Sequence, residues 1–518
     1  MPRLPHGKTI TIDEFREARD TLTARSADIT LGFAAAQPLT TQDFGFLLPE
    51  LQQNPDNLLP QSRATRDALV ELGKVMLDED PANGEDTDIP AAYTYFGQFV
   101  DHDITLDMES AELPELVDPD LVPLSLVQIE NDLQNARTAT LELDSVYGLP
   151  AERDPQDGRK MRIGKVSEFV SRPPGKDDFN DVPRERRSSD PEHDRAALIG
   201  DARNDENTII AQLHVAFLRA HNQLVDGGRT FGAARRVLRQ HYQHIVLHDF
   251  LKRIADPQIV DETIQQNRVY LPDPDDTFMP LEFSVAAYRF GHSMVRAEYD
   301  FNLNFLPADL GLLFTFTALS GQLGEFDTLP ENWIIQWPNF VDVDEPATRT
   351  RRIDTKLVEP LFTLPDLRGR PRQEDRARLA VRNLLRGYLL RLPTGQAVAR
   401  ALRQKLSGVR DIPVLGPNRI RNAAGSPDQV QKLEAGGFVE RTPLWYYILA
   451  EAALLEEGQR LGPVGSTIVA EVLVGLIRRS ENSILRITDW EPTLPSAQPG
   501  TFTLTDLLRV ARVLKQLQ

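Results

Sequence analysis

The stretch TPLWYYILAEAALLEEGQRLG, residues 442–462, shows the pattern that decides the fold. Its apolar residues recur every three or four positions, as on one broad face of a helix, and they are Leu444, Tyr447, Ile448, Ala452, Leu454 and Leu455. Glu451 interrupts this face, and Gly462 and Pro463 are stop signals at its end. The stretch therefore predicts a helix that buries one side in a core.

The same helical spacing recurs along the chain. It is found in residues 208–225, 235–254, 377–390, 466–480 and 505–517. Strand-like alternation is scarce, so we expect a mainly α fold with little β structure. We expect one large helical domain with long irregular loops.

The expected domain covers residues 40–518 and follows an N-terminal extension, residues 1–39. Pro and charged residues are concentrated at about 150–200 and 340–375. These segments are interpreted as loop excursions of one domain, because the helices on either side carry apolar faces that need partners.

Composition excludes several functional classes. The 518 residues carry a net charge of −19, which argues against a nucleic-acid partner. The chain has no cysteine, so a thiolate zinc site, an iron–sulfur cluster, a disulfide and a cysteine nucleophile are all excluded. Any metal must be held by His, carboxylates, carbonyls or a prosthetic group.

No stretch approaches the roughly 20 apolar residues that a membrane span requires. The first residues, MPRLPHGKTITIDEF, lack the apolar segment of a conventional signal peptide. We expect a soluble protein without a transmembrane segment, either cytoplasmic or secreted by an unconventional route.

The segment YFGQFVDHDITLD, residues 95–107, is the first that could carry chemistry. In a helix, Gln98, Asp101 and His102 share one face, set among apolar neighbours. Unpaired polar atoms are costly in such surroundings, so a network that only ties helices together is the alternative reading.

Three further segments contain polar residues in suggestive places. Arg203 and Glu206 lie one turn apart where a long helix starts, although such a pair is usually a surface ion pair. His292 lies among apolar residues three positions after Arg289, where a histidine is usually part of the core. Asn383 lies in another amphipathic segment and could meet a buried polar group.

Together these segments supply what a haem peroxidase needs. One neutral imidazole must ligate iron while its other nitrogen is held by a partner, roles that His292 and Asn383 would fill. On the opposite side, an imidazole must move a proton of hydrogen peroxide while a cation stabilises developing charge. His102 and Arg203 would be this second pair.

Three motifs also resemble a known family. GQFVDHD, RNDE and YRFGHSMV are similar to the distal-histidine, distal-arginine and proximal-histidine motifs of the mammalian-type (animal) haem peroxidase superfamily, and occur in its order. That superfamily includes myeloperoxidase, lactoperoxidase and peroxidasin, and the resemblance is closest to its cysteine-poor bacterial members. It covers about residues 40 to 480. The resemblance implies an enzyme that uses haem b, hydrogen peroxide and small electron donors.

The resemblance also implies roles for single residues. His102 would be the distal catalytic histidine, with Gln98 beside peroxide and any halide, and Arg203 would be the catalytic arginine. His292 would ligate the haem iron, and Asn383 would accept a hydrogen bond from its far nitrogen.

Three further residues would contact the haem. Arg289 would face a haem propionate, and Asp101 and Glu206 match the carboxylates that this superfamily esterifies to haem methyl groups. Both are present, so the resemblance implies up to two covalent links.

The segment RTATLELDSVYG, residues 137–148, resembles the superfamily's calcium loop. Asp103 would be the first ligand of one calcium ion. Setting the register on VYG gives the other ligands as Thr138, the Thr140 carbonyl, Glu142 and Asp144. A one-residue gap would instead make Asp144 the principal carboxylate, and an ordinary polar turn is the alternative.

Departures from the superfamily pattern point to the donor. Asn207 stands where myeloperoxidase has the Met of a sulfonium link, so iodide, thiocyanate and bromide are expected as donors ahead of chloride, alongside phenols. The fatty-acid dioxygenases place a radical Tyr where this chain has Arg289, with Tyr288 out of register, so that alternative is disfavoured.

A non-haem metallohydrolase is the other alternative. His241, His244 and His248 lie on one face of a predicted helix, with Asp249 adjacent. The Glu of an HExxH motif is absent, since Ile245 occupies its position, and a structural role is preferred.

Overall fold

A computed structural model gives the fold of most of the chain. It describes residues 10–11, 42–79, 86–109, 115–148, 151–168, 179–190, 193–272, 277–314, 317, 323–364 and 374–514. The expected N-terminal extension, residues 1–39, lies outside these ranges except for residues 10–11. Of the helices in the described part, none combines the length and apolar content that crossing a bilayer requires.

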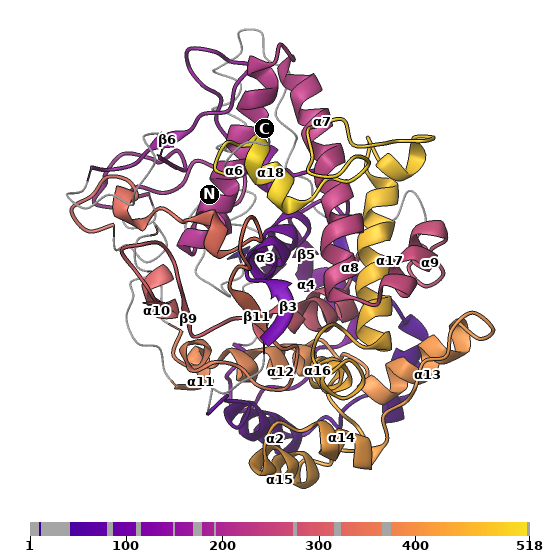
Figure 1. Ribbon diagram of the computed structural model, residues 1–518. Helices are drawn as coiled ribbons and strands as arrows, with labels where there is room; N and C mark the ends of the chain where they lie inside the picture. The colour runs from indigo at the N-terminus through magenta and orange to yellow at the C-terminus, as the bar shows by residue number, and fades with distance from the viewer. Residues whose placement is uncertain are drawn as a thin grey trace.

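Helices dominate, which confirms the predicted fold class (Figure 1). The α-helices are α2 (Arg63–Lys74), α3 (Ala92–Ile104), α4 (Leu126–Asp132), α5 (Asp144–Tyr147), α6 (Thr208–Asp226), α7 (Phe231–His244), α8 (Leu251–Ile254), α9 (Pro257–Gln265), α10 (Leu310–Leu313), α11 (Glu374–Ala377), α12 (Leu379–Leu389), α13 (Gly395–Lys405), α14 (Pro417–Ala423), α15 (Pro427–Ala435), α16 (Leu444–Leu455), α17 (Pro463–Arg479) and α18 (Leu504–Val510). The site is built from these α-helices and from four short helical segments. Two are 3₁₀-helices, η3 (Ala202–Asp205) and η6 (Ala287–His292), and two are π-helices, η4 (Ile245–Phe250) and η5 (Glu282–Ala286).

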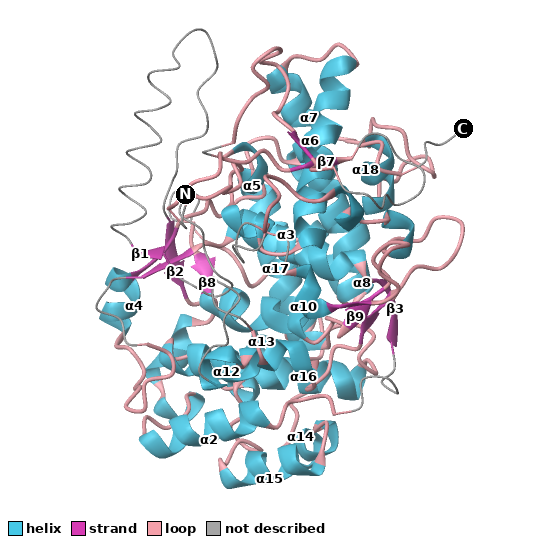
Figure 2. Ribbon diagram, turned by 90° about the vertical axis from the view of Figure 1, so that its left-hand side faces the viewer, coloured by secondary structure: helices cyan, strands magenta, loops and turns pink. Residues whose placement is uncertain are grey.

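Strands are short and lie at the periphery (Figure 2). The largest sheet has the order β1 (Ile10–Thr11), β4 (Asp107–Glu109), β5 (Leu133–Asn135), β2 (Gln42–Gly45) and β8 (Met279–Pro280). The described residues also form three two-stranded pairs, namely β3 (Asp86–Pro90) with β11 (Arg349–Arg351), β6 (Gly164–Lys165) with β7 (Asn180–Asp181), and β9 (Glu298–Tyr299) with β10 (Ala308–Asp309). The main sheet joins the segment after α3 to the chain before η5, since β4 follows α3 and β8 precedes η5.

Most predicted helices form, but their ends differ. The helix predicted over residues 442–462 ends at Leu455, because Glu457 and Gly458 adopt left-handed backbone with φ of 51° and 70°. The helix predicted over 505–517 ends at Val510, near Arg512 with φ of 58°. The helix predicted over 235–254 forms as α7, η4 and α8, with η4 wound as a π-helix.

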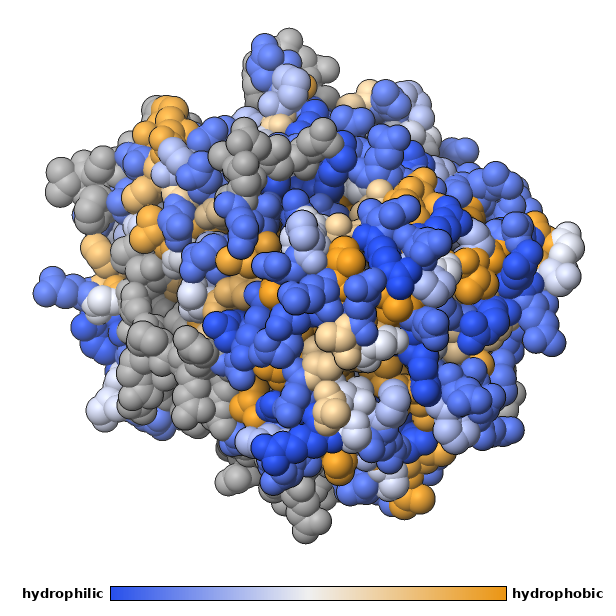
Figure 3. Space-filling model, turned by 90° about the horizontal axis from the view of Figure 1, so that it is seen from below, coloured by the Kyte–Doolittle hydropathy of each residue, from blue (hydrophilic) through white to orange (hydrophobic). Residues whose placement is uncertain are grey.

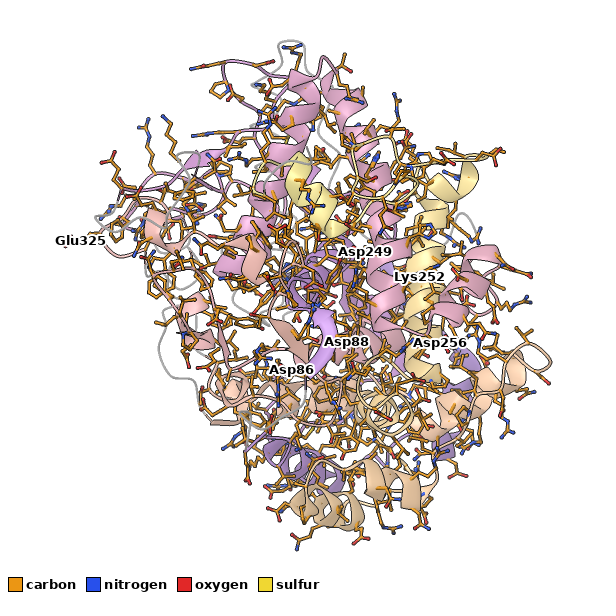
Figure 4. All side chains as sticks on the ribbon, in the orientation of Figure 1. Asp86, Asp88, Asp249, Lys252, Asp256 and Glu325 are labelled. Carbon is orange, nitrogen blue, oxygen red and sulfur yellow. The ribbon has the colours of Figure 1, made fainter. Side chains whose placement is uncertain are left out.

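The helix α3 lies at the centre of the molecule, among α6, α7 and α17 (Figure 1). One fully buried tyrosine fixes its first turn, because the Tyr93 hydroxyl donates to Asp249 Oδ2 at 2.6 Å. Asp249, labelled in Figure 4, also accepts from Arg253 Nε at 2.7 Å and from the Leu504 N–H at 2.9 Å. The same carboxylate therefore ties α3 to the long α7–η4–α8 helix and to α18.

One apolar cluster runs from Phe44 to Leu514 and includes residues of α3, α6, α12, α16 and α17. The outer surface is different. Seen from below, on the side that α2, α14 and α15 occupy, hydrophilic residues cover much of the described surface and apolar residues are scattered among them (Figure 3). An ion pair of 2.9 Å between Lys432 Nζ and Glu71 Oε2 joins α15 to α2.

Glu451 interrupts the apolar face of α16 because it caps the next helix. Its buried carboxylate accepts from the backbone N–H groups of Val464 at 2.8 Å and Gly465 at 3.3 Å, at the start of α17. A Cβ on Gly462 would lie 2.4 Å from Glu451 Cγ, so only glycine leaves room for this cap. Burial raises the pKa of Glu451 to about 8.

This raised pKa predicts a pH effect on stability. The folded protein holds the Glu451 proton more tightly than the unfolded chain does. The stability gained from this tighter binding is therefore fully present below the ordinary glutamate pKa and is lost as the pH rises to about 8. We expect Glu451→Gln to gain stability relative to the wild type over this interval, by up to roughly 1.4 kcal/mol per pH unit. Urea unfolding of both proteins from pH 5 to 8 measures it, and parallel pH profiles would contradict it.

Candidate active site

Solvent reaches α3 along one narrow face. Gly97, Gln98 and Asp101 are partly exposed, and the other residues of α3 are buried. The motif that contains them forms the second half of the helix, which begins at Ala92 instead of at the motif. Of the three residues predicted to share one face, Gln98 and Asp101 lie on this open side of α3, whereas His102 is buried.

The turn η6 contacts α3 and, like it, has only a few partly exposed residues. Arg289, Gly291 and His292 are partly exposed, whereas Ala287, Tyr288 and Phe290 between them are buried. A Cβ placed on Gly291 meets no atom within 4 Å, so the space beside His292 is open. The partly exposed residues of α3 and η6 are therefore mainly polar or charged.

His102 is buried, with 4% of its surface exposed. Its ring Nδ1 lies 2.8 Å from Asn204 Oδ1, which follows Arg203 in η3. Burial lowers the pKa of His102, and the charge of Arg203 lowers it further, while nearby carboxylates oppose the change. Burial and Arg203 therefore favour the neutral imidazole, which is the form that can accept a proton.

Arg203 holds the end of α3 in place. Its guanidinium donates to Asp201 Oδ2 at 2.8 Å, to the His102 carbonyl at 3.3 Å and to the Thr105 carbonyl. Arg137, fully buried, donates to Asp201 and to the same His102 carbonyl. Burial alone would raise the pKa of Asp201, but the two arginines bring it well below its usual range. Asp201, Arg203 and Arg137 together form a charged clamp beside His102.

Gln98 connects the open face of α3 to the chain before α6. Its Nε2 donates to Glu206 Oε1, and its Oε1 accepts from Asn207 Nδ2 at 3.2 Å. Asp101, one turn further on, accepts from the Thr105 hydroxyl at 3.0 Å. The structure therefore brings Gln98 and Glu206 together, with Asp101 on the same face as Gln98.

His292 has an asparagine partner as well. Asn383 on α12 places its amide nitrogen 2.8 Å from His292 Nδ1, across 91 residues of sequence. Arg289 donates through Nε to the Ser284 carbonyl at 2.8 Å. Since side chains three residues apart align in a 3₁₀ turn, Arg289 and His292 project to the same side.

The candidate calcium residues form a second polar cluster. Asp103 is fully buried and accepts from the N–H groups of Leu143 and Ser145, each at 3.1 Å. Asp144 Oδ2 accepts from the Thr138 hydroxyl at 2.7 Å, and its Oδ1 is buried without a partner among the described residues. Burial, followed by the charge of Asp144, raises the pKa of Asp103 to about 8. The charge of Arg137 and the two backbone N–H groups oppose this change only in part.

Thr140 and Glu142 are placed differently. The Thr140 hydroxyl donates to Thr138 Oγ1 at 2.9 Å, so Thr140 lies beside the cluster. The Glu142 carboxylate lies 2.8 Å from Arg239 Nη1 and accepts from the Glu481 N–H at 2.6 Å, so it is bound by partners outside the predicted ligand set. Within the described ranges, no three His, Cys, Asp or Glu side chains gather as a metal site.

The three histidines weighed as a metallohydrolase site do not form one in the described structure. His241 Nδ1 bonds to the Val237 carbonyl at 2.7 Å, and its Nε2 accepts from the Thr493 and Leu494 N–H groups. The rings of His244 and His248 lie 4.6 Å apart, and His248 is exposed. The structural role preferred for His241 agrees with its contacts.

Several residues of the site were not identified from the sequence. Asn204 and His214 form a chain with His102, and Asp201 and Arg137 form the clamp around Arg203. Asn204 is one letter of the RNDE motif, which is the only signal that pointed near it. Asp201 is close to Arg203 in sequence, but His102 and Arg137 come from distant segments, which spacing along one helix does not reveal.

Comparison with known proteins shows a likeness to peroxidases. Residues 125–308 match the animal haem peroxidase family, a range that includes Arg203, Glu206 and His292. A peroxidase-like protein of Margaritifera margaritifera is 29% identical over 40% of this chain and 32% of its own length. Myeloperoxidase of Mus musculus is 23% identical over 48% of this chain and 40% of its own length. The matches thus span less than half of these curated relatives.

Solved structures share the fold. Peroxidase A of Dictyostelium discoideum aligns with a TM-score of 0.53 and 17% identity, covering 82% of this chain and 84% of that protein. The fatty acid α-dioxygenase of Oryza sativa aligns with a TM-score of 0.54 and 14% identity, covering 86% of this chain and 75% of that protein. At these identities the likeness concerns the fold alone.

Proposed function

We propose that this chain, a relative of the animal haem peroxidases, binds haem b between α3 and η6 and uses hydrogen peroxide to oxidise small donors. The single observation that supports this most is that two histidines on neighbouring elements each have an asparagine partner. His102 and His292 lie on elements in contact, and each has its Nδ1 beside an asparagine amide at 2.8 Å. An imidazole held at Nδ1 leaves Nε2 for iron or for a proton.

The residues present fit a haem. A cysteine-free chain cannot bind iron through a thiolate, and His292 is partly exposed beside the open space at Gly291. With His292 Nε2 as the ligand, Nδ1 must carry the proton, so the Asn383 amide must turn its oxygen to the ring in the holoenzyme. Arg289, on the same side of η6, would pair with a haem propionate.

Bound haem would supply the electrons that cleave the O–O bond of the peroxide. His102 would take a proton from one peroxide oxygen at Nε2 and return it to the other, which leaves as water. Its lowered pKa keeps it ready for the first transfer. Arg203 would stabilise the charge that develops on the departing oxygen, and Gln98 would orient the peroxide.

Asp101 and Glu206 would form the ester links to the haem. They line the same region, since Glu206 bonds to Gln98 and Asp101 lies one turn after it. We expect haem to resist acid–acetone extraction after turnover with peroxide, to be partly released from Asp101→Asn or Glu206→Gln, and to be fully released from the double variant. Free extraction from the peroxide-treated wild type would contradict both links.

One calcium ion would bind at the cluster of Asp103, Asp144 and Thr138, with the Thr140 carbonyl as a further oxygen ligand. The support is the unpartnered, buried Asp144 Oδ1 opposite a second buried carboxylate. Because Asp103 follows His102 directly, the ion would fix the end of α3.

Removing this ion should loosen the distal side. We expect a strong chelator, or Asp103→Asn, to lower the melting temperature by several degrees and slow the reaction with peroxide. Calorimetry and calcium analysis of the purified protein measure it. A wild-type protein that contains no calcium and is unaffected by the chelator would contradict the site.

The donor would be a small anion or a phenol. Asn207, bonded to Gln98, cannot form a sulfonium link, which favours iodide, thiocyanate and bromide over chloride. The fatty-acid dioxygenase alternative shares the fold but would need a radical tyrosine next to the haem, and Tyr288 is buried in a stack with Phe283. Haem-loaded protein should oxidise iodide and guaiacol only with peroxide. Oxygen uptake with palmitic acid in its absence would favour the dioxygenase.

A further inference from the structure

We propose that Asn204 is a positioning residue that sets the tautomer of His102 through a coupled pair of histidines. This inference rests on the proposed peroxidase function and adds a residue that orients its proton acceptor. The amide of Asn204 lies between two ring nitrogens, 2.8 Å from His102 Nδ1 and 3.0 Å from His214 Nδ1. Both Asn204 and His214 are fully buried.

An amide in this position links the two rings. It has one end that accepts and one that donates, so exactly one of the two Nδ1 atoms carries a proton. As placed, Asn204 Oδ1 faces His102 and Nδ2 faces His214. His102 then donates from Nδ1 and keeps a free lone pair on Nε2, while His214 accepts at Nδ1.

His214 suits the accepting role. Burial lowers its pKa to about 3, so the ring is neutral and Nδ1 can accept. Its other nitrogen, Nε2, is buried and has no hydrogen-bond partner among the described residues. Nothing described on that side selects a tautomer of His214, which leaves Asn204 to set both rings.

The consequence concerns any ligand that must give up a proton on binding. In the haem-loaded protein, His102 with an unprotonated Nε2 would take the proton of hydrogen cyanide: the H–C bond would break, the proton would move to Nε2, and the cyanide anion would be free to bind the ferric haem. With the opposite tautomer, Nε2 already carries a proton and this transfer is blocked. Carbon monoxide brings no proton to ferrous haem, so its binding does not depend on the tautomer.

Two variants of similar shape separate this role from simple packing. Asn204→Leu removes the amide, and Asn204→Asp keeps an oxygen acceptor facing His102 Nδ1. We expect Asn204→Leu to slow association of hydrogen cyanide by about tenfold and to leave carbon monoxide association within about twofold of the wild type. Asn204→Asp should retain a cyanide rate within about threefold of the wild type. Stopped-flow absorbance measures all of these rates on the haem-loaded proteins.

Other outcomes would overturn the proposal. These are an unchanged cyanide rate in Asn204→Leu, equal slowing of both ligands, or an Asp variant as slow as the Leu variant. A Leu variant that takes up no haem would also overturn it, because a residue that only sets a tautomer is not needed for haem uptake. A wild-type protein that binds neither haem nor cyanide would instead defeat the proposed function, so the two failures are distinguishable.

Discussion

Replacing His102 with alanine should slow the reaction of the haem-loaded protein with hydrogen peroxide by about 10²- to 10⁴-fold. The variant loses the neutral imidazole that burial and Arg203 keep available as a proton acceptor. Arg203 remains bound to Asp201 and to the Thr105 carbonyl, so the end of α3 should keep its position. Stopped-flow absorbance at increasing peroxide concentrations gives the bimolecular rate constant.

His248→Ala is the matched control. His248 is exposed on η4 and lies outside the proposed site, so its replacement should leave the rate constant unchanged. A His102→Ala variant that reacts with peroxide at close to the wild-type rate would refute the proton-transfer role, whatever its effect on later steps.

Replacing His292 with alanine should weaken haem binding by about two orders of magnitude or more. Loss of an outer partner typically costs 10- to 100-fold in metal affinity, and here the proposed ligand itself is lost. Haem titration of protein that has not met peroxide, followed in the Soret region, measures the affinity without interference from ester links. Added imidazole should occupy the vacated position and restore much of the ferric spectrum.

Asn383→Ala provides the graded comparison. It keeps the ligand but removes the partner at 2.8 Å, so haem should still bind, with an affinity about 10- to 100-fold weaker. A His292→Ala variant with the wild-type affinity and spectrum would show that another residue ligates the iron.

The parts predicted most directly are those set by local geometry. The spacing of Gln98, Asp101 and His102 places them on one helix face, and α3 has that face. The helix over residues 208–225 could likewise be predicted from its period, and α6 covers Thr208–Asp226. The pairing of His292 with Asn383 was proposed from the chemistry that a haem site needs and from the resemblance, because local spacing cannot show a contact across 91 residues.

What could not be predicted depends on single backbone turns. Leu143 adopts a left-handed φ of 56°, and the following Asp144 bonds to Thr138 while Glu142 before it pairs with Arg239. A register set on the letters VYG cannot detect such a turn. The early end of α16 has the same origin, since Glu457 also adopts a positive φ.

Asn204 shows a different limit of sequence reasoning. It stands beside Arg203, the residue that the motif draws attention to, yet its partners come from α3 and α6. Only the fold brings these rings to opposite ends of one amide. The chemistry of the site therefore depends on contacts between elements as much as on the motifs within them.

The most direct test of the whole account is an absorption spectrum of the purified, haem-supplied protein before and after one equivalent of hydrogen peroxide. We predict an intense Soret band from haem bound at His292, which changes within seconds of adding peroxide and returns when iodide is added. Protein that stays colourless, or whose Soret band does not respond to peroxide, would contradict the central claim.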